Sequence, residues 1–191
     1  MAPRTCCPGS RRSPAGSGAR PPRADRAPRG VRRIVADGHT LCNHGMRHED
    51  MSAWPPERIA ADLREAGDAI RAAAPYARIR YFRAPYGAWG QTPAVAASLG
   101  MQPLGWRLAV ADWETPGTDE LVRRLLDGIT PGAVVLLHDG GRDRSQTVDA
   151  VDRVVPALRA QRWRFTVTYQ WALATDRYVP PCGGTVPVLS A

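Results

Sequence analysis

Two histidines, His44 and His48, stand four residues apart in the stretch Asn-His-Gly-Met-Arg-His. On a helical turn, residues at this spacing lie on the same face. Two imidazoles so placed can bind one metal ion, and zinc accepts nitrogen ligands readily. The spacing therefore predicts a metal site, and the alternative is a pair of ordinary surface or core histidines.

Three more groups of polar side chains follow predicted strands, namely Arg83 to Tyr86, Asp112 with Trp113, and His138. Each group alone has a plain structural explanation, as a surface charge, a core tryptophan or a histidine bonded to the backbone. In parallel α/β folds, however, sites form at the carboxyl ends of the strands. Taken with the histidine pair, these groups predict one site at one mouth of a barrel-like parallel sheet.

The elements that would position these groups alternate between strand and helix. A helix is expected to end near residue 36, with Gly38 as its C-terminal cap, and residues 44–48 form a loop or a first helical turn. Further helices are expected over 56–74, 92–100, 118–129 and 145–161, and strands over 39–43, 78–83, 101–109, 132–137 and 163–169. This alternation predicts an α/β fold whose parallel strands are joined by right-handed crossovers.

Two helices carry clear apolar stripes. In the first, Pro56 suits the first helical position, and Ile59, Leu63, Ala66 and Ile70 recur at helical spacing. In the last, the predicted stripe is Val148, Val151, Val155 and Leu158. Each stripe is expected to face the core.

The charge of the chain is concentrated at one end. All 26 basic residues of the 191-residue chain are arginines, and residues 1–33 carry the whole net charge of +8. The remainder is neutral, so no nucleic-acid partner is expected from the folded part. No apolar run is long enough to span a membrane, and no apolar segment of a signal peptide follows the first arginines, so the compartment stays open.

Composition also predicts the domain limits. Residues 1–30 contain no Leu, Ile, Val, Phe, Tyr or Trp, so they are expected to form a disordered tail. Residues 31–170 are expected to form the folded domain, and the Pro- and Gly-rich residues 171–191 a loose C-terminal tail. The four cysteines match no zinc or disulfide framework.

The order and spacing of these motifs resemble the NodB-homology polysaccharide deacetylases, which are carbohydrate esterase family 4, over about residues 31–167. The family's Asn-His-x-x-x-His, Arg-x-Pro-Tyr, Asp-Trp and Leu-x-His motifs are similar to residues 43–48, 83–86, 112–113 and 136–138 of this chain. The resemblance implies a (β/α) barrel and a hydrolase that removes acetyl groups from N- or O-acetylated glycans.

The resemblance also implies roles for individual residues. A divalent metal, expected to be zinc, would be held by His44 and His48. Catalytic roles fall to Arg83, Asp112 and His138, the last as the acid that protonates the leaving amine. The backbone N–H of Tyr86 would bind the oxyanion. Walls of the acetyl pocket would come from Trp113 and Leu136, with Trp89 as a further candidate.

One family motif has no counterpart. Relatives begin with a strand that ends in Thr-Phe-Asp-Asp-Gly, which supplies the catalytic base and the third metal ligand. No such sequence precedes His44, and Asp37 lies in the region that resembles a helix. The resemblance therefore implies an incomplete barrel that lacks the first strand–helix–strand, a weakened metal site, low stability and little activity.

Two other functions remain open at this point. The chain could be a non-catalytic remnant that binds glycans through a tryptophan-lined groove. Alternatively, the basic tail could associate with nucleic acid or another anionic surface.

Overall fold

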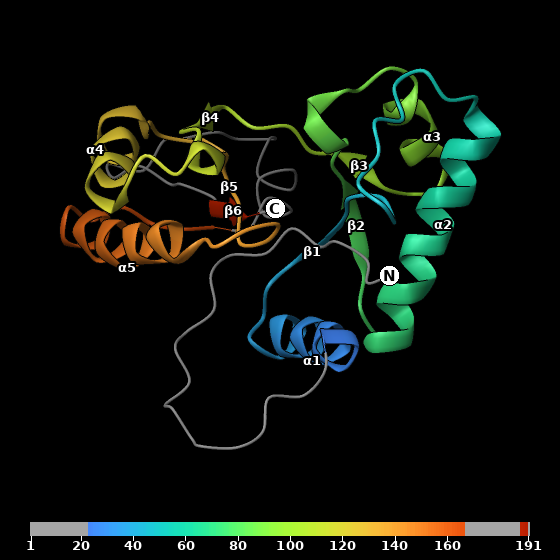
Figure 1. Ribbon diagram of the computed structural model, residues 1–191, viewed down its shortest axis with the longest axis horizontal. Coiled ribbons are helices and arrows are strands. Elements are labelled where there is room, and N and C mark those ends of the chain that lie inside the picture. The colour runs from blue at the N-terminus through green and yellow to red at the C-terminus, as the bar shows by residue number, and fades with distance from the viewer. Residues whose placement is uncertain (1–22, 167–187, 191) are drawn as a thin grey trace, which may run out of the picture. The chain divides into compact units, whose positions relative to one another are not determined.

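The computed structural model describes residues 23–166 and 188–190 (Figure 1). The chain divides into two compact units, Met1–Gly105 and Trp106–Ala191. Each unit contains a three-stranded sheet, and every strand pair in both sheets is parallel. The prediction of an α/β fold with parallel strands is therefore confirmed.

The first unit has the sheet order β1-β2-β3. Its elements are α1 Arg23–Ala36, β1 Leu41–Asn43, α2 Pro56–Ala73, β2 Ile79–Phe82, η1 Pro85–Gly87, α3 Thr92–Ser98 and β3 Gln102–Pro103. The predicted stripe of α2 is buried: Ile59 and Leu63 pack against Phe82 of β2 and Val95 of α3. Figure 1 shows α2 beside α3 in this unit.

Helix α1 corrects the predicted length of the N-terminal tail. It begins at Arg23, so residues 23–30, which were expected to be disordered, continue a helix. Arginine and alanine have high helix propensity, and Val31 anchors the helix against Leu41 and Ile70. Gly38 has φ +80° and donates its N–H to the carbonyl of Val35, which confirms the predicted cap. The rest of the predicted tail, residues 1–22, lies outside the described residues.

The second unit has the sheet order β4-β5-β6. Its elements are β4 Leu108–Ala109, η2 Asp112–Glu114, α4 Thr118–Gly128, β5 Val135–Leu137, α5 Ser145–Ala160 and β6 Val188–Ser190. Helices α4 and α5 lie side by side (Figure 1), and both pack apolar side chains against β5. The buried face of α5 consists of Thr147, Ala150, Val154 and Leu158. Leu158 was predicted correctly, and the other three predicted positions lie one residue too late.

Three predicted segments differ from the structure. The strand expected over 101–109 is two short strands, β3 and β4, which belong to different sheets. The strand expected over 163–169 is a single bridge at Arg164, and residues 167–169 lie outside the described part. Residues 188–190, expected to trail loosely, form β6 beside β5, since Val188 and Leu189 suit a strand.

A buried arginine explains the break between β3 and β4. Pro103 cannot donate to a ladder, and the Arg83 guanidinium donates to the carbonyls of Leu104 and Gly105 at 3.2 and 3.5 Å. These carbonyls therefore bond a side chain at the point where a continuous strand would bond its neighbour. Sequence periodicity carries no sign of such a competitor.

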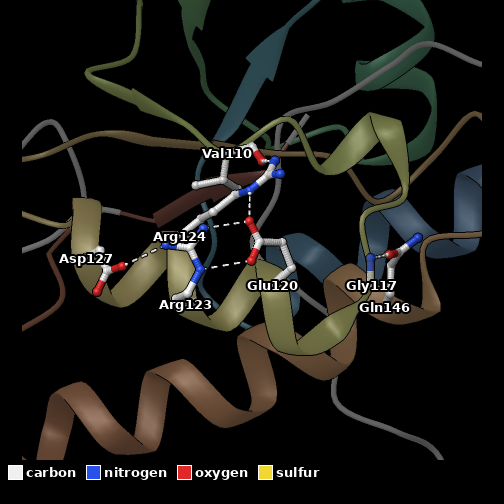
Figure 2. A network of polar contacts seen from close by, with 7 residues as sticks. All are labelled: Val110, Gly117, Glu120, Arg123, Arg124, Asp127 and Gln146. Carbon is white, nitrogen blue, oxygen red and sulfur yellow. Dashed lines mark hydrogen bonds and ion pairs between the residues drawn. The ribbon is translucent and has the colours of Figure 1, made fainter.

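Helix α4 carries a network of ion pairs on its exposed side (Figure 2). The Glu120 carboxylate accepts hydrogen bonds from Arg123 and Arg124, and Arg123 also pairs with Asp127. Arg124 reaches back to the carbonyl of Val110 at 2.9 Å. The arginine hydrogen bonds lower the pKa of Glu120 to about 2.

We predict that Gly90→Ala destabilises the protein far more than Gly100→Ala. Both glycines have positive φ, +45° and +78°, which costs an alanine about 1–2 kcal/mol. A Cβ at Gly90 would also lie 2.1 Å from the Ser52 carbonyl oxygen, whereas a Cβ at Gly100 meets open space. Urea denaturation of the two variants should therefore give clearly unequal losses in the free energy of unfolding, and equal losses would contradict the packing described here.

We also predict that Glu120 contributes to acid sensitivity. A folded pKa of about 2, below the ordinary 4.5, stabilises the fold above pH 4.5, and this contribution disappears as the pH falls toward 2. The Glu120→Gln variant should therefore show a smaller drop in melting temperature over that window than the parent chain. Glu57→Gln, at an exposed glutamate outside the network, is the matched control and should change the drop less than Glu120→Gln does.

Candidate active site

His44 and His48 lie on a loop that follows β1, not on a helical turn. The chain turns at Gly45, with φ +72°, and at His48, with φ +58°. The two imidazole rings nevertheless lie close, with centroids 4.9 Å apart and planes at 75°. Of the two predicted alternatives, the loop is therefore correct and the helical turn is wrong, although the rings do come together.

Buried polar side chains hold this histidine loop in place. The Asn43 side chain donates to the carbonyl of Leu63 at 2.8 Å and accepts from the N–H of Gly45 at 3.0 Å. The carboxylate of Asp62, on the buried face of α2, accepts from the N–H of Met46 at 2.8 Å. A loop whose own N–H groups are bonded in this way has few alternative conformations.

The orientation of His44 is fixed by the neighbouring strand. Its Nδ1 lies 2.8 Å from the carbonyl oxygen of Arg83, and the ring is buried. A carbonyl only accepts, so Nδ1 carries the hydrogen and the neutral ring has its lone pair at Nε2. A backbone carbonyl bonded to one ring nitrogen is the usual support for a histidine that binds metal through the other.

The donor set fits a metal only in part. His44 and His48 would supply two imidazole nitrogens, which suit a divalent ion such as zinc. Among residues 23–166 and 188–190, no group of three His, Cys, Asp or Glu side chains is placed to hold an ion. A zinc site in a protein usually has at least three protein ligands, so a further ligand is needed beside the two histidines.

Arg83 and Tyr86 lie at the end of β2, beside the histidine loop. The Arg83 side chain is 1% exposed, and its backbone N–H donates to the carbonyl of Asn43 at 2.9 Å. Tyr86 is 73% exposed, has φ +58°, and its ring centroid lies 4.6 Å from that of His48. Trp89, the additional pocket candidate, packs against Phe82 at the edge of the core.

In the second unit, Asp112 and His138 form a tightly bonded pair. The Asp112 carboxylate is fully buried and accepts from His138 Nδ1 through Oδ1 at 2.8 Å. Its Oδ2 accepts from the backbone N–H of His138 at 2.8 Å. These bonds place the hydrogen on Nδ1 of the neutral ring and fix the direction of Nε2.

The predicted pocket residues of this unit lie near that pair. Trp113 is 44% exposed, and its ring meets the His138 ring edge to face at 5.4 Å. Leu136 lies on β5, two residues before His138, and is only 6% exposed. An exposed aromatic ring beside a fixed imidazole can pack against a small apolar group of a ligand.

Two polar residues that the sequence reasoning missed support these clusters. Asp62 supports the histidine loop, and the Thr147 hydroxyl donates to Asp112 Oδ2 at 3.2 Å. Each is a polar residue on the buried and otherwise apolar face of its helix. The helical spacing in the sequence places Asp62 on the buried face of α2. Thr147 was missed because the predicted stripe of α5 began at Val148.

The chain also matches known proteins. Residues 18–104 match the family model described as polysaccharide deacetylase. A chitooligosaccharide deacetylase from Bradyrhizobium sp. (strain ANU 289) is 42% identical over 141 residues, covering 68% of this chain and 64% of that protein. A peptidoglycan-N-acetylglucosamine deacetylase from Bacillus cereus is 32% identical over 146 residues, covering 75% of this chain and 68% of that protein.

This chain belongs to the polysaccharide deacetylase family, carbohydrate esterase family 4. A solved structure of the family agrees: a mutant of a Bacillus anthracis pseudoenzyme, with restored enzymatic activity, matches with a TM-score of 0.66 and 28% identity. The match covers 73% of this chain and 50% of that one. The chain spans about two thirds of the length of the curated deacetylases it matches. The predicted family and NodB-type fold are confirmed.

We predict that zinc binds to the histidine loop, weakly for a zinc protein because two imidazoles are available. Isothermal titration should show that His44→Ala and His48→Ala each abolish this binding. The matched control is His39→Ala, at a histidine that precedes β1 and lies outside the loop. Zinc binding that survives loss of both loop histidines would contradict the assignment.

Proposed function

We propose that this deacetylase-family chain hydrolyses acetyl groups from N-acetylated or O-acetylated glycans, with a divalent metal at His44 and His48. The observation that supports this best is the buried Asp112–His138 pair, in which a fixed imidazole lies beside a half-exposed tryptophan. Curated relatives are chitooligosaccharide and peptidoglycan deacetylases, so an N-acetylglucosamine polymer is the proposed substrate class.

The histidine loop supplies the metal-holding part of the proposal. A bound divalent ion would polarise the acetyl carbonyl and lower the pKa of a coordinated water. His44 would donate its Nε2 lone pair, because Nδ1–H is bonded to the Arg83 carbonyl. The exposed turn at Tyr86 is proposed to offer its backbone N–H to the developing oxyanion.

His138 is the proposed general acid. Hydrolysis joins a water oxygen to the acetyl carbon and breaks the carbon–nitrogen bond, so the leaving nitrogen needs a proton. In its protonated form, with Nδ1–H bonded to Asp112, His138 would deliver that proton from Nε2. Asp112 stabilises the protonated ring, while Trp113 and Leu136 are proposed to enclose the acetyl methyl group.

Arg83 has a different setting from the one that the family resemblance implies. Its expected role is to pair with the catalytic base, and the chain shows no Asp-Asp motif that would supply this base. Its guanidinium donates to Leu104 and Gly105, while its carbonyl orients His44. We propose that Arg83 acts chiefly by positioning the histidine loop, and that activity is low for want of the base.

A non-catalytic glycan-binding protein is the second candidate. The absence of a third His, Cys, Asp or Glu ligand from the described part favours it, and a structural relative of the family is itself a pseudoenzyme. In that case Trp113, which is 44% exposed in the second unit, would supply an aromatic contact to a sugar ring without turnover.

We predict slow, zinc-dependent acetate release from N-acetylglucosamine oligomers. Without general-base help, the rate should fall about 10²–10⁴-fold below that of the Bacillus cereus relative under the same conditions. Release should disappear on chelation and in His44→Ala and His138→Ala, and should persist in His39→Ala.

The outcomes separate the candidates. A rate equal to that of the relative would contradict the proposed impairment. If zinc-loaded protein releases no acetate but binds the oligomers by titration calorimetry, the non-catalytic candidate is correct and the hydrolytic proposal is wrong.

A further inference from the structure

The carboxylate of Asp112 is held from three sides. It is fully buried, so each oxygen must find its hydrogen-bond donors within the protein. Oδ1 accepts from the His138 ring, while Oδ2 accepts from the His138 backbone at 2.8 Å and from the Thr147 hydroxyl at 3.2 Å. Thr147 is the one donor of the three that does not belong to His138.

The origin of that third bond matters for geometry. The last torsion of an aspartate side chain is soft, so one bond at each oxygen leaves the carboxylate plane free to swing. Both bonds from His138 would move with the histidine, because they come from the same residue. The Thr147 hydroxyl comes from α5 and gives the carboxylate a reference that is independent of His138.

The start of α5 contacts Asp112 in a second way. Arg144, which precedes the helix, donates from Nη1 to the backbone carbonyl of Asp112 at 3.4 Å. Thr147 itself is only 3% exposed and lies in the first turn, where the helix dipole favours a nearby negative charge. The same helix end therefore positions both the backbone and the carboxylate of Asp112.

We propose that Thr147 is a positioning residue for the acid histidine: through Asp112 it fixes the tautomer and direction of the His138 ring. Thr147 does not touch the reacting atoms. The inference rests on the proposed function for its catalytic meaning, but its structural content concerns only the arrangement of Thr147, Asp112 and His138.

Two substitutions separate the hydroxyl from the shape of the side chain. Thr147→Val keeps the volume and removes the donor, whereas Thr147→Ser keeps the donor and removes a methyl group. In the 191-residue chain, nitrogen-15 NMR of the neutral His138 ring should show hydrogen on Nδ1 in the parent and in Thr147→Ser. In Thr147→Val the spectrum should show a mixture with the Nε2–H tautomer.

Zinc-dependent acetate release gives the second readout. Thr147→Val should lower kcat about tenfold, with KM unchanged, and Thr147→Ser should stay within about threefold of the parent, since a hydrogen bond to a charged group is worth at least a factor of ten. A purely structural role would instead lower the melting temperature of both variants and leave the tautomer as it is.

The tautomer measured by NMR and the rate of acetate release test different claims. If Thr147→Val folds and keeps the pure Nδ1–H tautomer, the inference is overturned, whatever the rate. If the tautomer shifts as expected while neither parent nor variant releases acetate, the positioning role stands and the proposed hydrolytic function is wrong. Should Thr147→Val fail to fold, Thr147→Ala with the same NMR measurement replaces it, and a pure Nδ1–H tautomer there overturns the inference equally.

Discussion

The hydrogen bond from His44 Nδ1 to the carbonyl of Arg83 is the constraint on which the first unit's site depends. It follows from the parallel register, because Asn43 of β1 pairs with Phe82 of β2. His44 directly follows the first of these residues and Arg83 directly follows the second. Once that bond forms, the ring nitrogen that can bind a metal is decided. The N–H groups of Gly45 and Met46 then hold the rest of the histidine loop by donating to the side chains of Asn43 and Asp62.

The second unit uses the same principle with a carboxylate in place of a carbonyl. Ala109 of β4 pairs with Leu136 of β5, so the residues beyond the two strand ends come within reach of each other. Asp112 and His138 meet there, and Ala111 adopts φ +53° just before the turn that delivers the aspartate. In both units, therefore, short parallel strands convert residues far apart in sequence into bonded pairs. Within the described residues, no helix is long and apolar enough to cross a membrane.

Much of this could be predicted from the sequence because it depends on local patterns. The stripe of Ile59, Leu63 and Ile70, the start at Pro56 and the cap at Gly38 all act within one helix, and all were correct. The order and spacing of the motifs predicted the family, and the described structure agrees with the fold of that family. The predicted site residues lie in two groups, one in each unit, and their catalytic roles stay proposals.

The errors have physical causes that local patterns do not contain. The segment 101–109 was expected to be one strand. It is divided after Pro103, where the side chain of Arg83, about twenty residues earlier, bonds the carbonyls of Leu104 and Gly105. Residues 188–190 become a strand because β5 offers an edge. The helix start at Arg23 was missed because the anchoring contacts of Val31 come from β1 and α2. Thr147 was missed because its partner, Asp112, lies on another element.

We propose that the loop after β1 is a metal site whose ligand atoms are fixed by β2. A crystal structure of the zinc-soaked protein, with anomalous scattering recorded at the zinc edge, tests it most directly. The account predicts one zinc ion about 2.0–2.1 Å from Nε2 of His44 and from a ring nitrogen of His48, with the Arg83 carbonyl still bonded to Nδ1. Zinc bound through Nδ1 of His44, or bound only elsewhere on the chain, would contradict it.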